Sequence, residues 1–420
     1  MQRHALRVTF FFLILLLTSI LVPSIEASLT WNTQQVKEYV WEGGNCPIAI
    51  DQSGITHIAY LDGYTLVYAS YNGREWTNET IATDAIYLIF DLILDSKGYP
   101  HILYEKKFEG PLRIANWDGQ VWSIQDTGVS YSDIAALAVD SLGNPSIIYT
   151  TFTTNINHDD WAKNTVNTSL IYARWTGTDW DTQIIDTVLK DSLSAISIAL
   201  SNKSAPYILY SPSSNLNIIK LATSQDSKWR IQDASSEASA GNCGKIVLDS
   251  KGYVHFLCTQ PYQNSSSLRT ILYATFDLTT WSTQTVTSGI EVGTVANLVL
   301  DSQDNPHFTF RIYEGDSMYV AFSGDRWQIE KSPVDIGAGN LALDYSGNPH
   351  LLYRTGSPAR YCSHLIYASA IAGNATSLTS NVPDNTILEV TLAAVVILTI
   401  IVIATALQRN RLKNRRKINT

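Results

Sequence analysis

One ten-residue phrase recurs along the chain and restricts its fold more than any other feature. The clearest copies are residues 95–104 (DSKGYPHILY) and 344–353 (DYSGNPHLLY). In each copy an apolar run precedes an aspartate, Gly and Pro form a turn, and an alternating strand begins at a histidine. The first position of the phrase is occupied by Asp51, Asp95, Asp140, Ser201, Asp249, Asp301 and Asp344. Copies at spacings of roughly 45–60 residues predict a radial array or a solenoid.

Each unit has the pattern of four short strands. A brief apolar run, often with a small middle residue such as Ala49 or Ala342, is followed by the turn and the second strand. The third strand carries a Tyr-Ala pair, as at Tyr68 and Tyr367, and the fourth begins near a tryptophan such as Trp180. The period within each strand is two, which indicates an all-β fold.

The two ends of the array favour a closed ring over a solenoid. The seventh unit has no tryptophan strand before the chain becomes polar, whereas an unassigned tryptophan strand begins at Trp31 and matches the one at Trp180. An N-terminal strand that completes the last blade explains both facts, and a solenoid would end in polar caps instead. We therefore predict a seven-bladed β-propeller over residues 29–372.

The segments that flank the array predict an exported, membrane-anchored chain. Residues 1–28 have the charged, apolar and small-residue regions of a signal peptide. Residues 373–386 form a polar stalk, and residues 387–407 are apolar for the length of a transmembrane helix. Residues 408–420 are a basic tail that marks the cytoplasmic side. We expect a single-pass cell-membrane protein whose N-terminal ectodomain lies outside and whose C-terminal tail is cytoplasmic.

Charge and cysteine content narrow the classes of partner. The net charge is −9 although the tail is basic, so the ectodomain is acidic and a poor candidate for binding nucleic acid. Four cysteines are too few for a disulfide scaffold, but export permits pairing. Cys243 and Cys258 flank one copy of the phrase, and Cys46 and Cys362 lie in the first and last units, so both pairings are hypotheses.

The Gly-x-x-Trp turns carry a family resemblance. In the second unit the motif stands as Gly119-Gln120-Val121-Trp122, preceded by Asp118. On this motif the chain resembles the BNR/Asp-box (sialidase-like) β-propeller repeat proteins of microbial cell surfaces, and the resemblance covers all seven units as architecture. It implies that these residues shape turns and do not catalyse. Sialidases use an arginine triad and an Arg-Ile-Pro start motif, which this chain does not match, so we carry over no activity and no catalytic residue.

The residues that recur in most units are interpreted as structural. The histidines are His57, His101, His255, His307 and His350. Equivalent atoms on separate blades lie too far apart to share one metal ion, so we expect each histidine to form a hydrogen bond within its own blade. We interpret the phrase aspartates as turn formers and the tryptophans as packing between blades. No metal site and no cofactor is predicted from them.

The irregular loops are the candidates for ligand binding. The stretch between the second and third strands is long in unit three, where it contains His158, Asp159, Asp160 and Trp161, and in unit five, where it contains Tyr262. An acidic pair beside a tryptophan can bind a sugar or Ca²⁺, whose ligands are oxygen atoms. A solvated insertion explains the same residues.

Two functions from different classes follow. The first is a membrane-anchored extracellular binding module for a glycan or protein ligand. The second is a glycoside hydrolase or lyase that uses carboxylates on the loop face, with Asp159 and Asp160 joined by Glu291 or Asp335. Adjacent carboxylates on one loop rarely reach the separation that glycoside hydrolysis needs, which favours the binding module.

Overall fold

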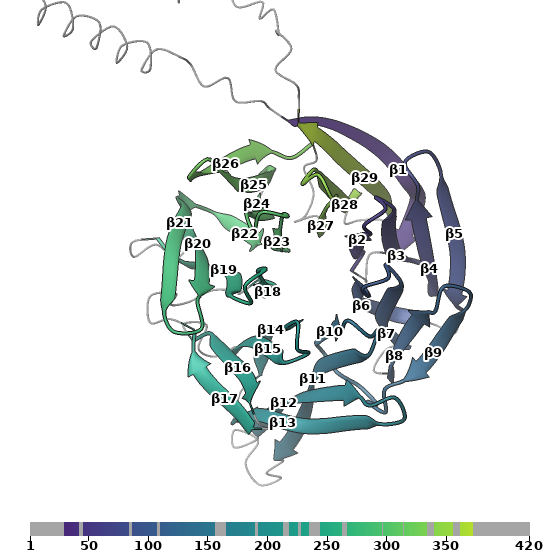
Figure 1. Ribbon diagram of the computed structural model, residues 1–420, viewed down its shortest axis with the longest axis vertical. Helices are drawn as coiled ribbons and strands as arrows, with labels where there is room; N and C mark the ends of the chain where they lie inside the picture. Colours follow the sequence, from purple (N-terminus) through teal and green to yellow (C-terminus); the bar gives the residue numbers. More distant parts are fainter. Residues whose placement is uncertain are drawn as a thin grey trace, which may run out of the picture. The chain divides into compact units, whose positions relative to one another are not determined.

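The chain forms a ring of antiparallel sheets, which confirms the predicted seven-bladed β-propeller (Figure 1). The computed structural model describes residues 29–41, 45–83, 86–106, 110–155, 165–189, 192–212, 218–225, 228–234, 244–262, 267–295, 297–313, 315–333, 340–355 and 362–372. Within these ranges no helix has the length and apolar character needed to cross a membrane. The predicted signal peptide, stalk, transmembrane helix and tail lie outside the described residues.

The first four blades are each built from four strands that are consecutive in the chain. Blade one contains β2 (Ile48–Ile50), β3 (Thr56–Asp62), β4 (Thr65–Tyr71) and β5 (Trp76–Ala82). Blade two contains β6 (Ile86–Leu94), β7 (Pro100–Lys106), β8 (Leu112–Trp117) and β9 (Trp122–Asp126). Blade three contains β10 (Ala135–Val139), β11 (Pro145–Asn155), β12 (Thr165–Trp175) and β13 (Trp180–Val188). Blade four contains β14 (Leu193–Leu200), β15 (Pro206–Pro212), β16 (Lys220–Gln225) and β17 (Lys228–Asp233).

The remaining blades complete the ring. Blade five contains β18 (Val247–Leu248), β19 (Val254–Pro261), β20 (Arg269–Phe276) and β21 (Trp281–Ile290). Blade six contains β22 (Val292–Val295) and β23 (Val299–Leu300), which both pair with β24 (Pro306–Ile312), then β25 (Ser317–Ser323) and β26 (Arg326–Lys331). Blade seven contains β27 (Asn340–Leu343), β28 (Pro349–Thr355), β29 (Cys362–Ala372) and, as its outer strand, β1 (Leu29–Trp41).

The pairing of β1 with β29 confirms the predicted closure of the ring (Figure 1). The two strands run antiparallel, with Trp31 opposite Ala370 and Gln34 opposite Tyr367. Closure in this way leaves no inner or central strand without a partner among the described residues, so only short outer edges remain open to solvent.

Apolar side chains fill the space between neighbouring blades. At the junction of blades one and two, fully buried Ala59 and Leu66 pack with Ile102 and Tyr104 of the next sheet. Burying a large apolar side chain contributes about 1.5–3 kcal/mol, so these interfaces account for much of the ring's stability.

The repeated tryptophans contribute to the same interfaces. Five of the seven pack edge-to-face on a tyrosine from the third strand of the preceding blade: Trp122 on Tyr68 at 5.1 Å, Trp229 on Tyr172 at 5.4 Å, Trp327 on Tyr273 at 5.2 Å, Trp31 on Tyr319 at 5.9 Å and Trp76 on Tyr367 at 5.4 Å. The predicted inter-blade packing role of the tryptophans is confirmed.

The repeated aspartates form the turns, as predicted. In blade two the Asp95 side-chain Oδ1 accepts the backbone N–H groups of Lys97 and Tyr99, at 2.8 and 2.9 Å. Gly98 has φ +80°, and a Cβ there would lie 3.1 Å from the Cβ of Asp51 in the preceding blade, so the turn requires glycine on both grounds. In blade four the hydroxyl Oγ of Ser201 accepts the N–H groups of Lys203 and Ala205 instead.

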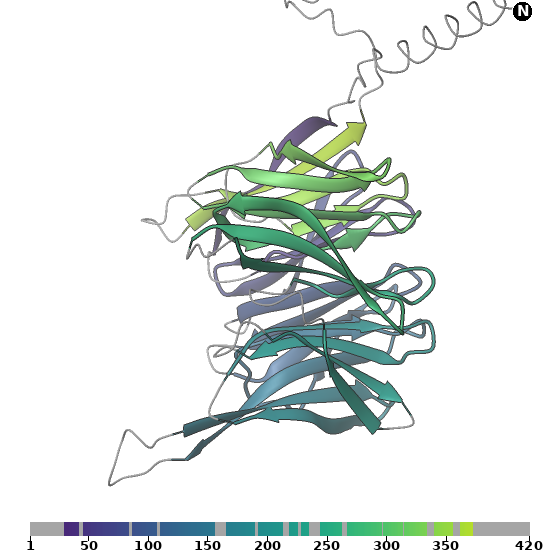
Figure 2. The same ribbon diagram turned by 90° about the vertical axis from the view of Figure 1, so that its left-hand side faces the viewer.

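The alternating strand directions divide the connections between two faces. We call the side that carries the tight turns between strands one and two, and three and four, of each blade the turn face. The other side, which carries the remaining connections, is the loop face. The β11–β12 hairpin extends beyond the rest of the loop face (Figure 2). Its strands reach Asn155 and resume at Thr165, because a run rich in Thr, Val and Phe continues the sheet into the expected loop.

Candidate functional site

The repeated histidines lie inside their blades, in a chain of polar contacts. In blade one the Nδ1 of His57 lies 2.6 Å from the hydroxyl of Tyr68, and its Nε2 lies 3.5 Å from Oδ2 of Asp51. A carboxylate only accepts, so we assign the proton to Nε2 and the donated hydrogen bond to the tyrosine hydroxyl.

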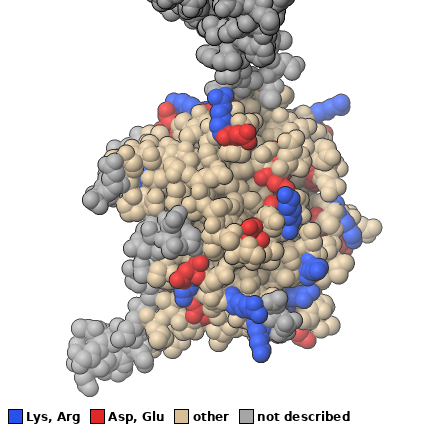
Figure 3. All heavy atoms as spheres, turned by 60° about the vertical axis from the view of Figure 1, so that its left-hand side comes forward, with Lys and Arg blue, Asp and Glu red and all other residues tan. Residues whose placement is uncertain are grey.

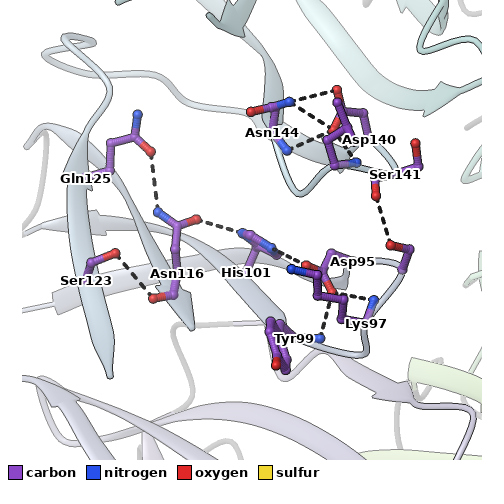
Figure 4. A network of polar contacts seen from close by, with 12 residues as sticks. Asp95, Lys97, Tyr99, His101, Asn116, Ser123, Gln125, Asp140, Ser141 and Asn144 are labelled. Carbon is purple, nitrogen blue, oxygen red and sulfur yellow. Dashed lines mark hydrogen bonds and ion pairs between the residues drawn. The ribbon is translucent and has the colours of Figure 1, made fainter. Parts of the chain in front are cut away.

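Four other blades repeat this arrangement. His255 contacts Tyr273 and Asp249, His307 contacts Tyr319 and Asp301, and His350 contacts Tyr367 and Asp344. In blade two His101 contacts Asp95 and uses Asn116 in place of tyrosine; Oδ1 of Asn116 only accepts, so Nδ1 of His101 donates there (Figure 4). The predicted hydrogen bond of each histidine within its own blade is confirmed, and we call each such set a relay.

Burial sets the protonation of the relays. Burial of the imidazole lowers the pKa of His57, His101, His255, His307 and His350, and the facing Asp or Asn partners only partly oppose the shift. The relay histidines are therefore neutral at pH 7. Across the described residues no three His, Cys, Asp or Glu side chains converge as a metal site would require.

A different repeated position brings polar groups together at the centre of the ring. The residue four places before each phrase aspartate lies in, or one or two residues before, an innermost strand. These seven residues are Pro47, Asp91, Ala136, Ser197, Lys245, Asn297 and Asn340. All seven line a cavity of about 350 Å³, which we call the channel mouth. The apolar part of its wall includes Phe90, Ile134 and Ile196.

Asparagine amides link four blades around part of the channel mouth. Nδ2 of Asn297 donates to Oδ1 of Asn340 at 3.0 Å, and Nδ2 of Asn340 donates to Oδ1 of Asn45 at 2.8 Å. Nδ2 of Asn45 donates in turn to the backbone oxygen of Phe90 at 3.3 Å. This chain of amides, from blade six through blades seven and one to blade two, is the amide belt. The belt holds amide donors and acceptors along the wall of one cavity.

One ion pair crosses the channel mouth. Nζ of Lys245 in blade five lies 3.3 Å from Oδ1 and 3.5 Å from Oδ2 of Asp91 in blade two. The side chains are 28% and 13% exposed, so the pair is partly withdrawn from water. Asp133, which lines the same cavity and is exposed, accepts a hydrogen bond from the hydroxyl of Tyr131. The site thus offers carboxylate, ammonium, amide and apolar groups together.

The residues proposed from the sequence do not line the channel mouth or lie outside the described residues. His158, Asp159, Asp160 and Trp161 lie outside the described residues, and Asp335 does too. Tyr262 lies between β19 and β20, where its N–H donates to the Leu268 oxygen and its ring packs against Gly289 of β21. It does not line the channel mouth, and its role in binding stays a prediction.

Glu291 and the cysteines are the remaining residues that the sequence analysis singled out. Glu291 is exposed, and its backbone oxygen accepts the N–H of Tyr313. Cys46 is buried, and burial raises the pKa of its thiol to about 11. Gly244, beside Cys243 in sequence, donates its N–H to the oxygen of Leu257, which adjoins buried Cys258. The Cys46 thiol is free, so the hypothesised pairing of Cys46 with Cys362 is not formed in this structure. The pairing of Cys243 with Cys258 stays a prediction, because Cys243 lies outside the described residues.

Sequence reasoning missed the channel mouth although a signal was available. Aligning the units on the phrase aspartate places Asp91, Ser197, Lys245, Asn297 and Asn340 in one column. The residue type at this position varies between units, whereas the residues that follow it are apolar. Such variation is typical of a position whose side chain does not pack in the core. The search for loops of unusual length passed over it.

Comparisons with known proteins support the fold alone. No family model and no curated protein matches the chain, so the Asp-box resemblance stays a prediction. A streptogramin B lyase structure is 11% identical over 83% of this chain and 100% of that chain, with a TM-score of 0.51. The polysaccharide lyase Uly1 is 10% identical over 82% of this chain and 99% of that chain, with a TM-score of 0.53. The fucose-specific lectin from Aleuria aurantia is 13% identical over 73% and 100%, with a TM-score of 0.45.

Proposed function

We propose that this protein is a membrane-anchored extracellular binding module that holds the end of a glycan in the channel mouth. The observation that carries the proposal is the convergence of the seven equivalent positions around one cavity. Structural repeats place one residue of each blade there, yet five of the seven are polar. Polar residues at positions that the frame does not require indicate a ligand.

The size and chemistry of the cavity favour a glycan over a folded protein. A volume of about 350 Å³ holds a small ligand, whereas a stable protein–protein interface needs about 800 Å² on each partner. Sugar hydroxyls both donate and accept, and the amide belt with Asp133 and Lys245 supplies both kinds of partner. Phe90 and Ile134 offer apolar surface to a ring face. One propeller of similar fold is a polysaccharide lyase, so polysaccharide fragments are a sensible first panel.

The test is a glycan array probed with the purified full-length protein, followed by calorimetry on each hit. We expect Asp133→Asn to weaken binding at least tenfold, about 1.4 kcal/mol, because a charged acceptor for a sugar hydroxyl is lost. The matched control is Asp325→Asn, an exposed turn-face residue at φ +68°, which removes the same charge and should bind as the parent does. A blank array, or equal loss in both variants, would reject the channel mouth as the site.

The enzymatic alternative is tested by the same hits. Of its four candidate carboxylates only Glu291 lies among the described residues, and Glu291 does not line the channel mouth. Incubation of each bound glycan with the protein should leave its length unchanged by mass spectrometry. Turnover that Asp160→Asn abolishes would make the hydrolase or lyase the correct function. Binding only to a protein in a pull-down would change the ligand class.

A further inference from the structure

A second cavity lies on the other side of the molecule, between blades four and five. It measures about 410 Å³ and is lined by Tyr207, Thr223, Arg230 and Gln232 of blade four and by Phe276 and Leu278 of blade five. Tyr207, Thr223 and Arg230 are directly opposite one another on three adjacent strands, so their side chains share the face that meets blade five. The turns that end near Ala205 and begin at Leu278 place this pocket toward the turn face.

The pocket coincides with the blade that has lost its relay. Register places Ser201, Tyr207 and Leu221 where blade one has Asp51, His57 and Tyr68. The substitution removes an aspartate, a histidine and a tyrosine hydroxyl together. Trp281 packs instead on Phe256 and Phe276 of its own blade, at 5.6 and 4.5 Å. Of the two described blades without a relay histidine, blade three keeps the paired hydroxyls of Ser146 and Tyr172, whereas blade four has this cavity.

A strained residue forms part of the pocket wall. Leu278 has φ +72°, at the turn position that Gly73, Gly119, Gly177 and Gly324 occupy in other blades. The left-handed region costs a residue with a Cβ free energy that glycine does not lose. Asp277 holds the turn by accepting the N–H groups of Thr279 and Thr280. A leucine kept where glycine fits better, with its side chain on a cavity, indicates a role in that cavity.

We propose that this pocket binds a pyranose unit that bears an anionic group, as a second site independent of the channel mouth. Phe276 and Leu278 present an apolar wall to the ring face, and Thr223 and Gln232 can bond hydroxyls. Among the described residues that line the pocket Arg230 is the only charged one, in a chain with 38 acidic side chains and 29 Lys and Arg. A guanidinium without a lining carboxylate favours a carboxylate or sulfate on the ligand.

Calorimetry on the purified full-length protein tests the ligand class. Methyl β-glucuronide should bind at least tenfold more tightly than methyl β-glucoside, and methyl glucoside 6-sulfate distinguishes a preference for sulfate from one for carboxylate. Inorganic sulfate alone should give no measurable heat. Equal affinity for the charged and neutral glycosides, or sulfate binding as tight as the glycosides, would overturn the proposal.

Two variants locate the site. Arg230→Gln should weaken glucuronide binding at least tenfold, whereas Arg74→Gln, an exposed arginine in a blade-one turn, should change nothing. Leu278→Gly should raise the thermal midpoint by about 2 °C and yet weaken binding severalfold, because it relieves the turn and removes the wall. A Leu278→Gly variant that binds as tightly as the parent would show that the leucine has no binding role.

Binding at the inter-blade pocket can be tested separately from binding at the channel mouth. Asp133→Asn should leave glucuronide binding at the inter-blade pocket unchanged, and Arg230→Gln should leave binding of the array ligand unchanged. If both variants affect the same ligand, the two cavities are not independent sites and the proposal fails.

Discussion

At the scale of single residues, the phrase aspartate of each blade that has a relay performs two tasks with its two oxygens. Oδ1 accepts the turn N–H groups, and Oδ2 faces the relay histidine, as Asp95 shows in Figure 4. A serine hydroxyl can accept the turn N–H groups, but it has no second oxygen to face a histidine. Ser201 accordingly forms the turn of blade four, and that blade has no histidine to face it. Blade four therefore lacks both the second carboxylate oxygen and the histidine that this oxygen faces in the blades with a relay.

The relays predict how stability depends on pH. The folded-state pKa of all five histidines lies below the ordinary value of 6.5, so the unfolded chain binds more protons. The free energy of unfolding should fall as the pH decreases below about 6.5, by up to about 1.4 kcal/mol per pH unit for each histidine. Urea midpoints measured from pH 7.5 to 5 check this.

A single relay can be removed as a control. His350→Gln should reduce the pH slope by the contribution of one histidine, because the variant has no imidazole to protonate at this site. Relative to the parent, the variant should therefore lose less stability at pH 5 than at pH 7.5. A midpoint that is constant between pH 7.5 and 5 would contradict neutral, buried histidines.

At the scale of elements, the fourth strand of each blade joins two blades through its tryptophan. Trp31 on β1 is 5.9 Å from Tyr319 of blade six at 81°, so the closing strand contacts blade six as well as completing blade seven. The same edge-to-face contact recurs at Trp122 and Trp327. Closure thus uses the contact that holds the other blades together.

Trp31→Ala tests the contribution of that contact. We expect the free energy of unfolding to fall by about 3 kcal/mol, because a large inter-blade side chain is replaced by a cavity. Tyr39→Ala on the same strand removes an aromatic side chain that is 57% exposed and should cost under about 1 kcal/mol. Urea unfolding of both variants gives the comparison. Equal losses would place the tryptophan outside the interface.

Much of the frame could be predicted from the sequence because each repeated feature has a local cause. The Gly-Pro turn, the period of two and the unmatched strand at Trp31 each depend on neighbouring residues, and they gave the number of blades and the closure. The channel mouth depends on seven residues from seven units that meet only when the ring closes. The partners Asp91 and Lys245 are separated by most of three blades, and nothing in the sequence of either strand indicates the other.

At the scale of the whole molecule, polar contacts connect blades that are distant in sequence. The amide belt runs through four consecutive blades, and the Asp91–Lys245 pair joins blades two and five across the channel mouth. On the surface, basic and acidic side chains are interspersed without a continuous patch of one sign (Figure 3). On the side of the molecule that Figure 3 shows, charges of both signs are mixed. At the centre of the ring, in contrast, an ion pair and the amide belt bring polar groups together.

The pair across the channel predicts a measurable coupling. A double-mutant cycle of Asp91→Ala and Lys245→Ala should give an interaction energy of about 1 kcal/mol, because the pair is partly withdrawn from water. The Lys37–Asp62 pair, with side chains 37% and 47% exposed, is the surface comparison and should couple more weakly. Thermal unfolding of the four proteins in each cycle supplies the values. A coupling near zero for Asp91 and Lys245 would mean that the two charges are solvated separately.

The order of the strands in blade seven has a consequence for biosynthesis. β1 is translated first, yet its partner β29 is the last strand of the ring to leave the ribosome. Until then the amino-terminal strand has an open hydrogen-bonding edge, and a contact this distant in the chain forms slowly. Polypeptides that stop short of residue 362 cannot close, so the exposed edge distinguishes unfinished chains from finished ones and gives chaperones and proteases a feature to recognise.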